Sequence, residues 1–292
     1  MRSSDLLRLL GLAAIWGASF LFMRVIAPVL GPLWTAEIRV GLAGIALILW
    51  MLMIRQPMPF RQHWRSFLLL GTVNSALPAA LYAYAAMHMP AGYSAIMNAT
   101  SPLWGAVMGA IFLGEQFTAR KLSGMLVGVA GVAMLVRLGP VAWSSELLLA
   151  LLACSAATIC YALAGVYTKK LSVKATPMLM ATASQVGAAI VLLPFLPLAP
   201  VKGEVTMTVL AFATVLALVC SAVAYLLYFR LIHDVGPTKA LTVTFLIPLF
   251  ALLWGALFLH ESITLSTLAG CAGVVLATWL VVFAPKPQPA EN

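Results

Sequence analysis

Ionisable side chains are scarce in the apolar segments of this sequence, so the exceptions are the first places to look for chemistry. Glu37 and Arg39 lie inside an apolar segment, where a charge is costly and marks a functional candidate. They are about 200° apart around a helix and would not face each other. Glu37 is the candidate for coupling to protons. Arg39 could bind a substrate carboxylate through two hydrogen bonds, or hold loop carbonyls. The structural role is slightly favoured, because the matching position in the second half is Ser184, beside Gln185.

The sequence motifs of nucleotide-driven and metal-dependent proteins are absent. There is no Gly-x-x-x-x-Gly-Lys-Ser/Thr motif, no His-Glu-x-x-His motif and no Asp-rich run. The four cysteines lie in apolar runs without Cys-x-x-Cys spacing and are expected to fill helix contacts. We therefore expect no metal, no cofactor, no nucleotide partner and no catalytic residue. An integral-membrane enzyme would need clustered acids or histidines, which 8 scattered acids do not supply.

A second group of candidates consists of polar and aromatic residues near the middle of the apolar segments. Taken singly, each is more often a packing residue than a ligand contact. Together, on matched segments of the two halves, they predict a cavity with aromatic walls and a few hydroxyl groups, which suits an apolar or aromatic side chain. The candidate binding residues are Trp16, Ser19, Met23, Tyr82, Asn98, Ser101, Trp104, Tyr161, Tyr225, Tyr228, Thr244 and Phe245.

The elements that must position these residues are membrane helices. The chain is 63% hydrophobic and 9% charged, whereas a soluble domain carries about 25% charge. Apolar runs that cross lipid must be helical, at about 20 residues each, so an all-α integral membrane protein is predicted. We expect ten transmembrane helices, at Leu6–Ile26, Leu33–Ile54, Ser66–Met87, Gly92–Leu113, Thr118–Val136, Leu147–Thr168, Pro177–Leu196, Thr206–Ile232, Ala240–Leu259 and Leu265–Phe283.

The basic residues fix the expected orientation. The net charge of +9 does not indicate a nucleic-acid partner, because all but three of the 17 lysines and arginines lie in the gaps between apolar runs; the three are Arg24, Arg39 and Arg230. Twelve of them fall on the side of the N-terminus, and only Arg137 and Lys202 fall on the opposite side. Both termini are therefore expected in the cytoplasm.

The two halves of the chain repeat each other. A shift of 146 residues places Pro102 on Pro248 and Glu115 on Glu261, within a shared Phe-Leu-x-Glu ending. We expect a first five-helix repeat at 1–142, a second at 143–284 and a disordered cytoplasmic tail at 285–292. Because five is odd, the second repeat begins on the opposite side of the membrane. Inverted repeats of this kind are typical of alternating-access transporters.

The repeat-matched Glu115 and Glu261 each follow a helix end and are expected to hold the start of the next helix. Apart from Glu37, no acid lies well inside a predicted span. A proton-coupled mechanism therefore has few titratable groups, and downhill facilitated export is a serious candidate.

The pattern that runs from Pro102-Leu-Trp to Phe112-Leu-Gly-Glu115, repeated at Pro248–Glu261, resembles the signature of the EamA family in the drug/metabolite transporter superfamily. Within it, the chain is most similar to YddG-type exporters of aromatic and other neutral amino acids. The resemblance implies export of such amino acids and related metabolites across the bacterial inner membrane. It implies small-molecule and lipid partners only, and the sequence is compatible with a monomer.

Three alternatives remain open. A proton-coupled exporter of other metabolites or drugs would require an acid deep in the cavity. A sugar-phosphate carrier would require several basic residues at mid-depth, and Arg39 alone is too few. A structural subunit would make no demand on the polar residues in the middle of the spans.

Overall fold

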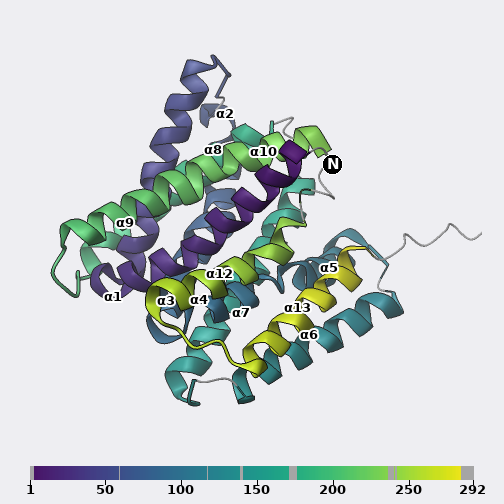
Figure 1. Ribbon diagram of the computed structural model, residues 1–292. Helices are drawn as coiled ribbons and strands as arrows, with labels where there is room; N and C mark the ends of the chain where they lie inside the picture. The colour runs from purple at the N-terminus through teal and green to yellow at the C-terminus, as the bar shows by residue number, and fades with distance from the viewer. Residues whose placement is uncertain are drawn as a thin grey trace, which may run out of the picture.

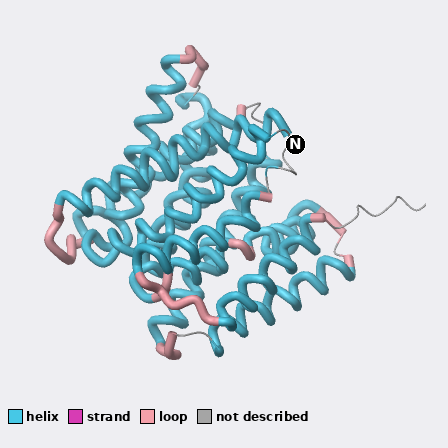
Figure 2. Tube along the Cα trace, viewed as in Figure 1, coloured by secondary structure: helices cyan, strands magenta, loops and turns pink. Residues whose placement is uncertain are grey.

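Helices make up the ordered framework of the protein (Figures 1 and 2). The computed structural model describes residues 3–58, 60–116, 118–138, 141–170, 176–235, 240 and 242–283, and these contain no β-strand. The predicted tail at 285–292 lies outside the described residues. The first half contains α1 (Ser3–Met53), α2 (Phe60–Gly71), the π-helical turn η1 (Thr72–Ala76), α3 (Leu77–His88), α4 (Ala91–Asn98), α5 (Ser101–Leu113) and α6 (Ala119–Leu138). The second half contains α7 (Ser145–Lys170), α8 (Pro177–Leu192), the 3-10 turn η2 (Leu193–Leu198), α9 (Met207–Ala217), the π-helical turn η3 (Leu218–Val223), α10 (Ala224–Val235), α12 (Val243–Leu259) and α13 (Leu265–Val282).

The long helix α1 is interrupted at Gly31. Its 51 residues are more than twice the length needed to cross a bilayer. Gly31 has φ 79° and ψ 166°, a conformation open to glycine, and Pro32 follows it. This interruption separates the predicted spans Leu6–Ile26 and Leu33–Ile54.

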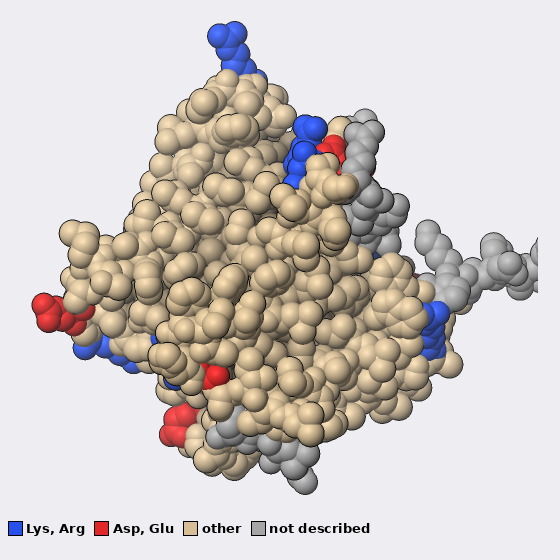
Figure 3. Space-filling model, in the orientation of Figure 1, with Lys and Arg blue, Asp and Glu red and all other residues tan. Residues whose placement is uncertain are grey.

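The described helices have the length and composition of membrane spans. Seven helical segments are long and apolar enough to cross a bilayer, and the 17-residue helix α12 is a shorter apolar one. Charged side chains on the face in Figure 3 gather toward its edges and leave a broad uncharged area between them. These features fit an integral membrane protein. The count of ten spans, and their grouping into two five-helix repeats, remain predictions.

Local geometry repeats between the two halves. The π-turns η1 and η3 begin at positions 146 residues apart. The helices α5 and α12 both end in the left-handed conformation, at Gly114 with φ 66° and at His260 with φ 53°. The repeat seen in the sequence therefore extends to irregular backbone features, which a shared apolar composition alone would not produce.

The helices α6 and α13, which match each other in the repeat, pack side by side (Figure 1). Their contact is made by backbone, because a Cβ atom at Gly270 would lie 2.8 Å from the carbonyl oxygen of Gly131. A Cβ atom at Gly131 would lie 3.0 Å from the carbonyl oxygen of Gly270. Small residues allow this close approach of helices in lipid.

Candidate functional site

A cavity of about 750 Å³ lies among the helices of both halves. Its wall includes residues from α1, α3, α5, α7, α10 and α12, together with the π-turns η1 and η3. A cavity of this size falls in the range of small-molecule sites. We refer to it below as the central cavity.

Ten of the twelve candidate binding residues line the central cavity. They are Trp16, Ser19, Met23, Tyr82, Asn98, Ser101, Tyr161, Tyr225, Tyr228 and Thr244. The other two, Trp104 and Phe245, do not line it. Trp104 is partly buried on α5, and the Phe245 ring lies against Phe283, with centroids 6.3 Å apart.

Aromatic rings from both halves meet around the cavity. The rings of Trp16 and Tyr228 lie 5.2 Å apart, and those of Tyr82 and Tyr161 are stacked at 6.3 Å. Phe20 contacts the Tyr82 ring edge-on at 5.6 Å. Such pairs hold large apolar faces in fixed orientations. Aromatic rings from α1, α3, α7 and α10 therefore form part of the cavity wall.

The helical break between α4 and α5 supplies part of the polar wall. The Tyr82 hydroxyl donates to Asn98 Oδ1 at 3.0 Å, and Ser101 Oγ donates to the Asn98 carbonyl at 2.6 Å. Irregular backbone at membrane depth is tolerated where it lines a cavity. The break therefore places main-chain and side-chain polar groups at the site.

The two π-turns bring further polar groups to the cavity. Asn74 of η1 donates to Ser184 Oγ at 2.9 Å, and Gln185 donates to Ser75 Oγ at 3.1 Å. Of these, Asn74 and Gln185 line the cavity, as does Cys220 in η3. Asn74, Gln185 and Cys220 were not among the twelve candidates, although the sequence places each beside a residue at a repeat-matched position.

Arg39 carries the positive charge of the inner wall. Its Nε donates to Ser221 Oγ at 3.2 Å, and its Nη1 lies 3.6 Å from Met23 Sδ. No carboxylate lies within 4 Å of the guanidinium nitrogens among the described residues. Among the described residues the guanidinium bonds no loop carbonyl, so the particular structural contact expected from the sequence is not formed, and binding of a carboxylate stays a prediction.

Glu37 lies on the same helix but outside the cavity lining. Its side chain is half-buried, and Oε2 accepts no hydrogen bond from the described residues. The predicted angular separation of Glu37 and Arg39 agrees with this arrangement.

A cluster of contacts surrounds Glu261 at the start of α4, outside the cavity lining. The backbone N–H of Ala91 donates to Oε1 and Oε2 of Glu261 at 3.0 and 3.1 Å. Arg24 donates to the carbonyls of Ala86 and Met87 at 2.8 and 3.2 Å, and its Nε lies 3.9 Å from Glu261 Oε1. The expectation for Glu261 was therefore wrong, since it holds the start of α4 and not of the following helix.

The next helix, α13, is held by a residue of its own. The Thr264 hydroxyl accepts a hydrogen bond from the Thr267 N–H at 3.2 Å, as an N-cap. The carboxylate of Glu261 is thereby left free for long-range contacts.

Glu115 lies at the other end of the α4–α5 pair and lines the cavity. It accepts a hydrogen bond from Lys169 Nζ at 2.9 Å, and Lys121 Nζ lies 3.8 Å away. The hydrogen bond from Lys169 lowers the pKa of Glu115 below its ordinary value. Thr118, and not Glu115, caps α6 through the Lys121 N–H, so the expectation for Glu115 was wrong as well.

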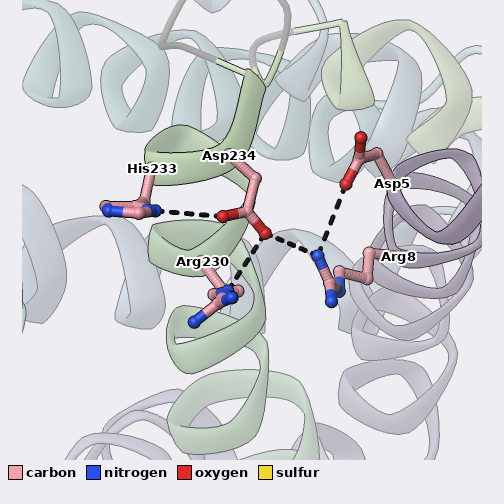
Figure 4. Close-up of polar contacts among 5 residues, drawn as sticks. All are labelled: Asp5, Arg8, Arg230, His233 and Asp234. Atoms are coloured by element: carbon pink, nitrogen blue, oxygen red, sulfur yellow. Dashed lines mark hydrogen bonds and ion pairs between the residues drawn. The ribbon is translucent and has the colours of Figure 1, made fainter. Parts of the chain in front are cut away.

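A charge cluster ties the start of α1 to the end of α10 (Figure 4). Asp234 accepts from Arg8 at 2.6 Å and from Arg230 at 3.0 Å, and the His233 ring lies 3.0 Å away. Asp5 accepts from Arg8 at 3.4 Å. The first and second halves are thus joined by charge at this point of the surface.

Comparison with known proteins assigns the chain to a family. The model of the EamA-like transporter family matches the chain twice, at residues 4–137 and 148–283. The chain belongs to the EamA-like transporter family. The double match assigns one family unit to each half and agrees with the repeat-matched backbone features.

Relatives of the EamA protein span almost its whole length. It is 26% identical to the uncharacterised transporter YvbV of Bacillus subtilis, covering 96% of this chain and 92% of that one. It is 29% identical to protein PecM of Dickeya dadantii (91% and 88%) and 26% identical to the uncharacterised inner membrane transporter YedA of Escherichia coli K12 (100% and 96%). A solved crystal structure shares the fold at TM-score 0.66 and 18% identity, over 96% of both chains.

These matches make the EamA protein an integral membrane transporter of the drug/metabolite transporter superfamily. The family and its relatives are named as transporters, which points away from an enzyme. The narrower resemblance to YddG-type exporters stays a prediction.

Proposed function

We propose that this EamA transporter exports neutral amino acids, especially those with aromatic or other apolar side chains, by alternating access. The observation that carries the proposal is the aromatic cavity that holds one guanidinium without a carboxylate partner.

The aromatic wall fits the apolar part of such a substrate. The Trp16–Tyr228 and Tyr82–Tyr161 pairs come from four helices, and all four residues line the cavity. A flat or branched apolar side chain gains contact with these rings and leaves water on entry. A sugar or a nucleotide would bring many hydroxyl or phosphate groups that this wall cannot satisfy.

Arg39 supports recognition of the carboxylate. An unpaired cation in a low-dielectric site is costly, and the carboxylate of a substrate would supply the missing negative charge. The guanidinium fork can donate two parallel hydrogen bonds to such a group. The oxygens of Asn98 and of the nearby hydroxyl groups suit the ammonium end. A zwitterion therefore fits better than a cationic drug.

The architecture supports alternating access. With α1 divided at Gly31, the described segments accommodate the ten predicted spans, and five in each repeat would invert the second repeat relative to the first. Sites at the interface of inverted repeats are exposed to either side by rocking of the halves. The central cavity draws its wall from both repeats, as this mechanism needs.

Transport down the concentration gradient of the substrate, without a coupling ion, is the favoured energy source. Within the described spans, the acids other than Glu37 lie near helix ends, as Asp5, Glu146 and Asp234 do. Proton-coupled export is the second candidate: the unpartnered Oε2 of Glu37 favours it, whereas the position of Glu37 outside the cavity lining counts against it.

Counterflow of labelled phenylalanine, methionine and threonine in proteoliposomes tests the proposal. We expect phenylalanine to exchange fastest, with no response to an imposed pH gradient. Phenethylamine, which lacks the carboxylate, should compete poorly. A response to the gradient that Glu37→Gln abolishes would support the proton-coupled candidate instead. Absence of exchange for all three amino acids would refute the substrate assignment.

A further inference from the structure

Two ion pairs occupy matched positions at opposite ends of the site. Arg24 Nε lies 3.9 Å from Glu261, and Lys169 Nζ lies 2.9 Å from Glu115. A shift of 146 residues carries Glu115 onto Glu261, and a shift of 145 carries Arg24 onto Lys169. Each pair joins the first helix of one half to the glutamate of the other half. The same cross-repeat contact is thus made twice.

The two glutamates are also held in the same way by their own chain. The N–H of Glu115 donates to the carbonyl of Gly109 at 3.2 Å, and that of Glu261 donates to the carbonyl of Gly255 at 3.1 Å. A Cβ atom at either glycine would collide with the carboxylate that lies against it. The bare glycine backbone therefore leaves room for each carboxylate at the end of its helix.

The two ends of the site are in different states. Glu261 and Arg24 are 16% and 34% exposed; Glu261 accepts from the first residue of α4, and both lie outside the cavity lining. Glu115 and Lys169 line the cavity and are 39% and 64% exposed. Because α4 and α5 run from Ala91 to Leu113, these contacts lie at opposite ends of that helical pair. The cavity is therefore shut at Glu261 and reaches the surface at Glu115.

We propose that Glu261 and Glu115 are alternating latches, which hold the site shut at one end and then at the other. The inference rests on the proposed alternating access, but not on the identity of the substrate. In this structure the Glu261 latch binds Ala91 and Arg24. In the opposite state it releases both, and the Glu115 contacts with Lys169 and Lys121, which are already formed but exposed here, become buried and hold that end shut.

The exposure of each pair explains how one can hold while the other yields. A partly buried carboxylate that accepts backbone N–H bonds at a helix start is firmly held. A water-exposed pair contributes little and swings easily. On closure the Glu115 pair would lose water and strengthen, because charge interactions grow as the effective dielectric constant falls. The ion pair of each latch is therefore strongest when its own end of the site is closed.

Labelling of a reporter cysteine in the cavity tests the latches. Ser101→Cys places a thiol in the cavity wall, and a membrane-impermeant maleimide is applied from each side of oriented vesicles. Peptide mass spectrometry separates label at position 101 from label at the four native cysteines. The assay needs no substrate, so an error in the amino-acid assignment leaves its result unaffected.

The two latch variants should shift labelling in opposite directions. Glu261→Gln should raise the rate from the Arg24 side by about fivefold or more, as expected for loss of one coupling contact. Glu115→Gln should lower that rate and raise the rate from its own side. The exposed Glu204, which lies outside both latches, provides a matched control as Glu204→Gln.

Size-exclusion profiles establish that each variant folds. If Glu261→Gln does not fold, Arg24→Gln and Lys169→Gln test the same two ends through the basic partners. Opposite shifts in the two variants support the latches. Equal shifts, or rates unchanged from those of the reporter alone, would overturn them.

Discussion

Arg39 donates a hydrogen bond from Nε to Ser221 Oγ at 3.2 Å, and this contact has a neutral counterpart in the other half. Ser184 and Ser75, which match Arg39 and Ser221, lie 2.6 Å apart. The two halves therefore bring the same positions together, but only one of them carries a charge. This asymmetry gives the cavity a cationic side.

The first prediction concerns that charge. Arg39→Gln should reduce phenylalanine counterflow by about tenfold or more, since hydrogen bonds to charged groups contribute about 1.5–3 kcal/mol. Arg39→Lys should keep part of the activity, because it retains the charge but not the fork. Initial rates in proteoliposomes measure both. Normal phenylalanine flux in Arg39→Gln would contradict a carboxylate-binding role.

The second prediction concerns the break between α4 and α5. Tyr82→Phe removes the hydroxyl that donates to Asn98 and should lower the free energy of unfolding by about 1 kcal/mol. Tyr84→Phe is the control, because the Tyr84 hydroxyl has no hydrogen-bond partner among the described residues. Thermal unfolding in detergent compares the two variants. Equal losses of stability would count against a specific contribution from the Asn98 contact.

The third prediction concerns the glycine contact of α6 and α13. Gly131→Ala places a methyl group against the backbone of α13 and should destabilise the protein by about 1–3 kcal/mol. Gly11→Ala meets no atom within 4 Å and should be neutral or slightly stabilising, since alanine is the better helix former. The midpoint of thermal unfolding should therefore fall for Gly131→Ala and stay the same or rise slightly for Gly11→Ala. An unchanged midpoint for Gly131→Ala would contradict a tight backbone contact between α6 and α13.

The fourth prediction concerns pH. Because Lys169 lowers the pKa of Glu115 from 4.5, the stabilisation by this pair is fully present above pH 4.5 and is lost as the pH falls through the lower value in the folded state. The small difference in unfolding midpoint between the parent and Lys169→Gln should stay constant from about pH 8 to about pH 5.5. It should shrink only in more acidic solution. A difference that disappears near pH 6 would show that Glu115 is not held by Lys169.

The depth of residues in the membrane could be predicted from sequence, but the direction in which they point could not. Apolar runs and the 146-residue shift placed ten candidates at the level of the cavity. The prediction for Trp104 failed because Trp104 is about 200° around the helix from Pro102 and about 100° from Gly105, and these two residues line the cavity whereas Trp104 does not. Phe245 likewise lies beside Thr244, which does line it.

The contacts between residues far apart in the chain could not be predicted from the sequence either. Glu261 was expected to hold the helix that follows it, because local contacts are the ones that spacing reveals. It holds instead a helix that begins 170 residues earlier in the chain. The choice between these partners is made by packing of the two halves, which no local pattern encodes.

The π-turns add a dependence on residue number to the site. One extra residue in a helix rotates everything beyond it by about 100°. Tyr82 and Tyr228 follow η1 and η3, so the faces that they present to the cavity depend on a count of residues as much as on chemistry. A single-residue deletion in either turn would leave an apolar, well-formed helix, but would rotate its tyrosine away from the cavity. The number of residues in each π-turn thus fixes the rotation of the helix that follows it. Insertions and deletions should therefore be tolerated least in the two turns, even though most of the residues in these turns do not line the cavity.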